Sequence, residues 1–422
     1  MLKGKGVFFV FYWIISIIKS NAMNQNETDS FFKWGKKHKV FFDNRIQLNP
    51  STNENPLPYF TSLDIIQKDT KIISIPSSFF INTKTIQTII KNKEIKSLWK
   101  SLLDIENPYI KYHTTKEMLF IALTVETYMR THPKKNKFYQ RYKKYFKFYQ
   151  YYSFDNYPLY YNEDELSFIS GTNLALNINT ARNSINEEIS IITNDLKINS
   201  IIPEDYTRYR IFTLSNSHII DNTTTVIPFI DLFPYDKMSP YVKWEYNNVT
   251  KSLDIITIRE IPKDVVISRE AKNVPNSVSL LYYGYTVENN ELVSPYIIET
   301  INKNRKKKLN LNTLEIQNDT YDIARQNFDK NIIDTYKIIC SKIKGCKEKG
   351  ELGAYEIMRD NVKDYLEVYD KFTPGNFNMI FYSKRKREDV KKVINIEKKL
   401  ILNRVAFLNR KIELIKSENG DL

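Results

Sequence analysis

The order of segment types along the chain constrains its fold more than any single motif does. Residues 71–75 (KIISI) are β-branched and end at Pro76, as a strand would. Residues 93–195 are mostly helical in their apolar spacing, and residues 205–290 return to strand-like segments. From about residue 310 an amphipathic helical stripe runs to the end. A β-region that is split by a helical insert and followed by a helical bundle predicts an α+β architecture.

Local patterns predict individual elements within this order. Residues 31–34 (FFKW) predict a short helix, and Asn162 is expected to cap a second helix over residues 163–169. Residues 242–258 alternate around an Asn-Asn pair, which is typical of a β-hairpin. Residues 264–268 (DVVIS) predict a short strand.

The N-terminal residues predict a targeting segment. Lys3 and Lys5 precede an apolar run over residues 7–18, and SNA follows with a small last residue. A helix of that run is about 18 Å long and cannot cross a hydrocarbon core of about 30 Å. We therefore expect a cleaved signal peptide over residues 1–22 and a secretory route, with an uncleaved membrane anchor as one alternative. A plastid-type leader is the other, but it would need a transit region, and the folded part begins by about residue 31.

Basic charge alone does not define a partner. The chain of 422 residues is long enough for two or three packed units, and its formal net charge is +14. The positive residues are spread over 135–147, 303–308 and 384–392 and are not gathered in one motif. Aromatic and basic residues interleave over 138–152, where a buried aromatic face with a solvated basic face is the simpler interpretation. We therefore expect no nucleic-acid partner.

Cysteine and histidine usage argues against a metal site. Cys340 and Cys346 are the only cysteines, so they form either one optional disulfide or a pair of buried thiols. The four histidines are scattered without the spacing of metal ligands. The sequence also lacks a phosphate-binding loop and a dinucleotide fingerprint. We therefore predict no metal cofactor.

Several segments share their order and spacing with the motifs of one known family. They are FFKW at 31–34, IISIP at 72–76, LTVETY at 123–128, PLYYNEDEL at 158–166, VIPFIDLF at 226–233, SLLYYGYTVENN at 279–290 and INIEKKLIL at 394–402. In this order they resemble the SET-domain methyltransferases of the RuBisCO large-subunit methyltransferase and actin-histidine methyltransferase type. The segment that contains YGY is the most specific, and together the segments cover most of the chain.

The resemblance implies a particular fold. It is a SET β-fold with a pseudoknot, split by a helical insert and followed by an all-α domain. Residues 31–92 would form its N-terminal part, residues 93–200 the helical insert and residues 201–300 its C-terminal part. Residues 305–418 would form the helical domain against which such enzymes dock their protein substrate.

The resemblance also implies a reaction. With S-adenosylmethionine as cofactor, a methyl group passes to a lysine amine, or in some members to a histidine nitrogen, of a protein substrate. The transfer needs alignment, exclusion of water and an uncharged amine, whereas free lysine has a pKa of about 10.4. Tyr283 is the retained channel residue. It is either a catalytic hydroxyl at the channel wall or a core aromatic that closes the pseudoknot.

The candidate cofactor-binding positions depart from the family's pattern. A G-x-G loop lets the family's backbone approach the cofactor, but Pro56 and Pro58 stand in the equivalent stretch, which has no glycine. Asp231 matches the family's motif, and counting from it places Pro234 and Tyr235 where the family has an Asn-His pair. Proline has no N–H and cannot replace an asparagine amide.

The catalytic position departs as well. The resemblance aligns the family's catalytic tyrosine with Arg269, where a guanidinium opposes a sulfonium donor. The arginine of the family's S-R-x-F segment is replaced within residues 214–217. Two hypotheses therefore stay open: a diverged protein methyltransferase, and a catalytically inactive SET pseudoenzyme that acts as a secreted or lumenal protein-binding module. A third is an interaction protein whose likeness to the family is only architectural.

Overall fold

The computed structural model describes most of the chain. The described residues are 25–50, 58–90, 93–107, 110, 112–130, 136–150, 157–287, 290, 330–381, 383–418 and 420. The predicted signal peptide over residues 1–22 lies outside them. Among the described residues, no helix is both long and apolar enough to cross a membrane.

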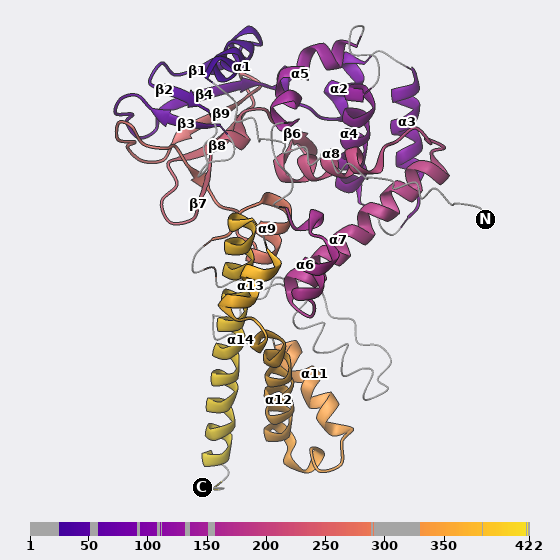
Figure 1. Cartoon of the computed structure of the whole chain (residues 1–422), viewed down its shortest axis with the longest axis vertical. Coiled ribbons are helices and arrows are strands. Elements are labelled where there is room, and N and C mark those ends of the chain that lie inside the picture. The colour runs from indigo at the N-terminus through magenta and orange to yellow at the C-terminus, as the bar shows by residue number, and fades with distance from the viewer. Residues whose placement is uncertain are drawn as a thin grey trace, which may run out of the picture.

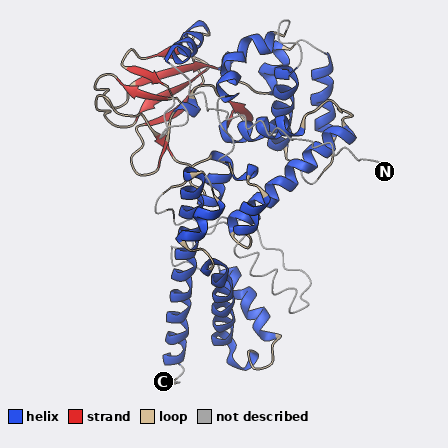
Figure 2. Ribbon diagram, viewed as in Figure 1, coloured by secondary structure: helices blue, strands red, loops and turns tan. Residues whose placement is uncertain are grey.

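The molecule has a broad end and a narrow helical extension. At the broad end a β-rich part lies beside the helical insert, and a group of helices extends away from both (Figure 1). The longest of these helices is α14 (Lys384–Glu418). Most strands gather in one part of the broad end (Figure 2). The predicted order of β-region, helical insert, β-region and helical tail is confirmed.

In the main sheet, the last strand in the sequence lies between two strands that come earlier in the chain. Its strands run in the order β1 (Phe41–Phe42), β4 (Lys71–Pro76), β9 (Ser252–Thr257), β8 (Val242–Asn247), β10 (Arg269–Glu270) and β7 (Tyr235–Asp236). Two ribbons pair β2 (Ile46–Asn49) with β3 (Tyr59–Ser62), and β5 (Ser217–Ile220) with β6 (Thr223–Val226). β8 and β9 form the predicted antiparallel hairpin. β10 is parallel to both β7 and β8, and this pairing builds the candidate site.

The insert is helical, as predicted for residues 93–200. Its helices are α2 (Thr83–Ile89), α3 (Lys93–Asp104), α4 (His113–Arg130), α5 (Lys137–Gln150), α6 (Glu163–Phe168), α7 (Asn173–Ser190) and α8 (Pro203–Asn216), of which α2 and α8 lie outside the expected bounds. Asn162 caps α6 as predicted, because its side chain accepts from the Glu165 N–H while the Glu165 carboxylate accepts from the Asn162 N–H. The predicted helix at FFKW lies inside α1 (Gln25–Lys37), which buries Phe31 and Trp34.

Two expectations for residues 205–290 are wrong. α8 and α9 (Asn276–Tyr283) are helices where strands were expected. α8 begins at a proline and carries Glu204 and Asp205 in its first turn, and all three favour a helix N-terminus. Residues 264–268 form an isolated bridge to β3 and no named strand.

The helical tail is anchored on the insert. Its other helices are α11 (Lys330–Ser341), α12 (Gly350–Asp370) and α13 (Pro374–Ile380). Lys386 of α14 forms an ion pair of 2.8 Å with Glu165 of α6, and both side chains are nearly buried. The ring of Phe168 packs against Phe377 and Phe381 at 5.2 and 5.9 Å. Cys340 and Cys346 form a disulfide at the end of α11, so the first of the two alternatives for these cysteines is confirmed.

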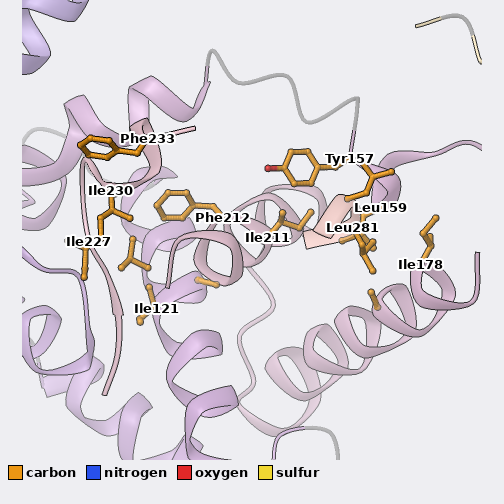
Figure 3. Close-up of a cluster of buried hydrophobic side chains, with 14 of the residues drawn as sticks. Ile121, Tyr157, Leu159, Ile178, Ile211, Phe212, Ile227, Ile230, Phe233 and Leu281 are labelled. Atoms are coloured by element: carbon orange, nitrogen blue, oxygen red, sulfur yellow. The ribbon is translucent and has the colours of Figure 1, made fainter. Parts of the chain in front are cut away.

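One apolar core fixes the elements that carry the candidate site. Buried side chains from the segment after β6, from α8, from α9 and from α7 lie in one cluster (Figure 3). Phe212, Phe233 and Leu281 in this cluster are each at most 1% exposed. A buried side chain of this size contributes about 2–3 kcal/mol of hydrophobic stabilisation. The elements that carry the site are therefore joined by buried, packed side chains.

Candidate functional site

Most of the predicted site residues come together at one edge of the main sheet. Asp231 lies in a buried 3₁₀ turn, and Pro234 and Tyr235 follow it into β7. Tyr283 is the last residue of α9, and its ring centroid lies 6.4 Å from that of Tyr235. Residues that are about fifty positions apart in the sequence are thus neighbours.

Pro58 reaches the same region through β3. It is buried directly before this strand. The ring of Phe60 in β3 packs 5.0 Å from that of Phe233, and the Phe60 carbonyl accepts from the Ile267 N–H at 2.9 Å. Pro56, the other proline of the predicted cofactor loop, lies outside the described residues.

Backbone hydrogen bonds hold residues 269–271 against β7 at this edge of the main sheet. The Arg269 N–H donates to the Pro234 carbonyl at 2.8 Å, and the Ala271 N–H donates to the Asp236 carbonyl at 3.1 Å. Proline at 234 lacks an amide donor, but its carbonyl is still the anchor of this pairing. The pairing sets Arg269 opposite Tyr235 in register.

Arg269 is the centre of the site. It is 2% exposed, and its guanidinium carbon lies 4.1 Å from the ring centroid of Tyr235 and 5.6 Å from that of Trp244. Its Nε donates to the Phe233 carbonyl at 3.1 Å. Its Nη1 has no hydrogen-bond partner among the described residues. The residue that the resemblance aligns with the catalytic tyrosine is therefore a buried cation between two aromatic rings.

Lys272 brings a second positive charge, which the sequence did not reveal. Its Nζ lies 4.3 Å from the ring centroid of Tyr283 and 3.3 Å from the Tyr283 hydroxyl. Its backbone N–H donates to the Tyr285 hydroxyl at 2.9 Å. Burial, and then the nearby charge of Arg269, lower the pKa of Lys272 to about 8. We call Arg269 and Lys272 the cationic centre.

Three tyrosines form a half-buried rim around the cationic centre. Tyr235 stacks on Tyr285 with ring centroids 4.1 Å apart, and Tyr283 lies 6.2 Å from Tyr285. Burial is the main cause that raises the pKa of Tyr283 and of Tyr285 to about 12. Both hydroxyls therefore remain protonated near neutral pH. We call Tyr235, Tyr283 and Tyr285 the tyrosine rim.

Two further buried groups respond to this charge. Burial raises the pKa of Asp231 to about 7, against the attraction of Arg269, and neither carboxyl oxygen has a hydrogen-bond partner of standard geometry among the described residues. Burial and then Arg269 and Lys272 lower the pKa of His218 to about 3, so this imidazole is neutral. Its ring packs edge-on against Trp244 at 5.1 Å.

The YGY segment is held by its glycine and by a pair of asparagines. Gly284 ends α9 with a φ of +70°, and a Cβ there would lie 2.9 Å from the Tyr157 ring, so glycine is needed. The Asn276 side chain donates to the Val287 carbonyl and accepts from the Val287 N–H. Asn290 donates to the Asn276 side chain. Lys272 and this clamp of Asn276 and Asn290 were missed, and Asn290 at the end of the YGY motif was the available signal.

These residues do not fit a sulfonium donor. S-adenosylmethionine carries a positive charge at its sulfur, and the centre already holds Arg269, which forms no ion pair with any of the described residues. Two unit charges about 5 Å apart repel by about 3 kcal/mol at an effective dielectric constant of about 20. Lys272 adds to this repulsion, and the proline at 234 supplies no side-chain amide. Among the described residues, no group of three or more His, Cys, Asp or Glu could hold a metal ion.

Comparisons with known proteins support the fold but do not establish the activity of this chain. No family model matches the chain, and no curated protein sequence matches it. Solved structures do. The SET domain of LSMT bound to methyllysine and AdoHcy matches with a TM-score of 0.64 and 12% identity, over 92% of each chain. Rubisco LSMT bound to AdoMet matches with a TM-score of 0.61 at the same identity and coverage, and Rubisco LSMT bound to sinefungin and monomethyllysine with 0.60.

The chain thus has the fold of the SET-domain methyltransferases. Within that class it has the fold of the Rubisco LSMT type, since the likeness extends over 92% of both chains. The predicted resemblance and the α+β fold class are confirmed. An identity of 11–12% establishes the fold alone.

Proposed function

We propose that this chain is a SET-fold protein in which the methyl-donor site has been lost, and which binds a protein partner without transferring a methyl group. Arg269 carries this proposal. Its buried guanidinium lies against Tyr235, where the resemblance places the tyrosine that a methyltransferase requires. A cation there repels a sulfonium and cannot supply a hydroxyl to orient an amine.

Calorimetry with the donor tests this proposal. We expect no binding heat when the full chain is titrated with S-adenosylmethionine at concentrations up to about 1 mM. The Arg259→Met variant is the control. Arg259 stacks on the Tyr241 ring at 3.9 Å, as Arg269 stacks on Tyr235, but it lies outside the site, so this variant should behave as the wild type does. Micromolar binding by the wild type would overturn the proposal.

A diverged methyltransferase is the second candidate. It would use S-adenosylmethionine to methylate a lysine or histidine of a protein substrate. The support is the whole-chain likeness to structures with AdoMet, AdoHcy and lysine bound, together with the hydroxyls of the tyrosine rim. Incorporation of label from a methyl-tritiated donor into a protein, abolished by Tyr283→Phe, would establish this candidate and end the first.

The partner is expected to dock on the helical tail. In Figure 1 the helices α11, α12 and α14 extend away from the broad end, and Met379 on α13, near the base of this extension, is 68% exposed. A photo-crosslinking residue placed at Met379 should capture the partner. The same residue at Val249, 92% exposed in the hairpin turn of the sheet, should not. Capture at Val249 alone would place docking on the sheet.

A secretory route is part of the proposal. The disulfide between Cys340 and Cys346 supports it, since such bridges persist in oxidising compartments. A fluorescent protein fused to residues 1–30 should enter the secretory pathway. A fusion that stayed in the cytosol would refute this route.

A further inference from the structure

We propose that the cationic centre of Arg269 and Lys272 binds a carboxylate, presented at the tyrosine rim. This deepens the proposed function, because it names the chemical group that replaces the positively charged ligands of a methyltransferase. The inference rests on four features of the site: unpaired charge, an incomplete internal counter-ion, free hydroxyl hydrogens and partial exposure of the rim.

The cationic centre lacks the counter-ion that two other buried cations of this chain, Arg210 and Lys386, possess. Arg210 pairs with Glu188 at 2.9 Å, and Lys386 pairs with Glu165 at 2.8 Å. Among the described residues, no acidic group lies within ion-pair distance of Arg269 or Lys272, and Arg269 Nη1 has no hydrogen-bond partner. An unpaired charge that is buried is costly, so an anion that meets both cations would be stabilised.

Asp231 does not complete the pairing. It lies close enough to feel the charge of Arg269, but burial still raises its pKa to about 7. Near neutral pH this carboxyl is therefore ionised only in part, while Arg269 carries a full charge and Lys272, with a pKa of about 8, remains mostly protonated. The net charge of the three groups is positive.

The tyrosine rim offers donors to an anion. The hydroxyl oxygens of Tyr283 and Tyr285 accept hydrogen bonds from the side chain and the backbone of Lys272. Each hydroxyl keeps its own hydrogen, which can point to a bound oxyanion. Hydrogen bonds to a charged acceptor are about twice as strong as neutral ones. Lys272 and the three tyrosines are half-buried, so the Lys272 side of the centre faces solvent at the rim, while Arg269 lies behind it at 2% exposure.

The net positive charge of Arg269, Lys272 and Asp231 determines which ligand charge suits the centre. A lysine ammonium or a sulfonium would meet two cations. A dianionic phosphate would match them, but it would also meet the partly ionised Asp231, whereas a carboxylate carries one charge and forms the planar, paired hydrogen bonds that suit a guanidinium. The carboxylate can belong to a free organic acid or to an Asp or Glu side chain of the protein partner. Both sources present the same chemistry.

Calorimetry of the full chain with two carboxylate probes tests this inference. One probe is butyrate and the other is a capped Gly-Glu-Gly peptide, with a capped Gly-Gln-Gly peptide as the neutral control. We expect at least one carboxylate probe to bind and the neutral peptide not to bind. Binding of butyrate alone would identify a free acid as the source, and binding of the Glu peptide alone would identify a side chain.

Variants of Lys272 locate the binding. Lys272 is half-buried at the rim, so Lys272→Met is expected to fold, and it should weaken binding at least tenfold. Lys272→Arg should keep most of the affinity, and Arg259→Met should keep all of it. Absence of binding by both probes, or equal affinity in the wild type and Lys272→Met, would overturn the inference. Donor binding would instead overturn the proposed function, so the two failures are distinguishable.

Discussion

Two buried arginines differ in one respect that separates structure from function in this molecule. Arg210 in α8 meets Glu188 of α7 through a pair of hydrogen bonds, and the Tyr206 hydroxyl donates to the same carboxylate at 2.7 Å. Arg269 in β10 is 2% exposed, and within the described part of the chain its guanidinium meets a backbone carbonyl and two aromatic faces but no acidic ion-pair partner. The first arginine therefore completes a hydrogen-bonded ion-pair network inside the helical insert, whereas the charge of the second is not neutralised by an ion pair.

The difference teaches where this chain can vary. A paired charge in the insert cannot be changed alone, because its partner would be left buried without compensation. Arg269 at the edge of the sheet forms no ion pair among the described residues, and Asp231, which feels its charge, is ionised only in part near neutral pH, so removal of Arg269 leaves no fully charged partner behind. The scaffold of the SET fold is therefore maintained by satisfied networks and apolar packing, while the centre that would perform chemistry is free to change its function.

The largest expected effect is on the paired arginine. Arg210→Met should lower the free energy of unfolding by about 3–5 kcal/mol, because Glu188, 4% exposed at its side chain, loses its cation. Arg208→Met, two residues earlier on α8, removes an exposed pair with Asp205 and should change stability by at most about 1 kcal/mol. Urea unfolding followed by circular dichroism measures both. Equal losses in the two variants would break the comparison.

Glu397 in α14 is the opposite case, a buried carboxyl that forms no ion pair with a cation among the residues that the structure describes. It is 5% exposed and accepts from the Tyr369 hydroxyl at 2.7 Å, and burial raises its pKa from 4.5 to about 8. The folded protein thus holds a proton that the unfolded chain releases, so this contribution is fully present below about pH 4.5 and is lost as the pH rises through about 8.

Glu397→Gln therefore removes a pH dependence. Between pH 6 and pH 8 we expect the group to cost the wild type about 2 kcal/mol of stability, and the glutamine variant should be flatter over this range. Urea unfolding at both pH values measures the difference. Identical pH profiles for the two proteins would show that Glu397 titrates normally and would weaken the contrast between paired and unpaired charges.

The smallest effect is expected at the unpaired arginine. Arg269→Met loses one hydrogen bond to the Phe233 carbonyl and the contact with the Tyr235 ring, but it also relieves the repulsion with Lys272. These terms offset each other, and we expect the free energy of unfolding to change by no more than about 1 kcal/mol. A loss of 3 kcal/mol or more in the urea midpoint analysis would mean that Arg269 is structural, as Arg210 is.

The sequence predicted the fold through the order of its segments and the positions of its strongest motifs. The KIISI strand, the Asn-Asn hairpin and the Asn162 cap are local features, and all three are confirmed. α8 was missed because its apolar residues permit both periods, and the deciding signals were Pro203 and the two acidic residues after it.

The candidate site was predicted only in part. Asp231, Pro234, Tyr235 and Tyr283 were identified by counting along motifs, and the structure brings them to one edge of the sheet. Lys272 could not be found in this way, because its place depends on the parallel pairing of β10 between β7 and β8. A parallel pairing joins segments that no local pattern connects.

The titration of Lys272 tests most directly the claim that the centre of this SET fold holds unpaired positive charge. Nuclear magnetic resonance of the full chain labelled at its lysine side chains gives the titration midpoint. The structure predicts about 8 in the wild type, and a higher value in Arg269→Met, where the repulsion is gone and burial alone acts. A midpoint near the ordinary value of 10.5 in both proteins would contradict the cationic centre.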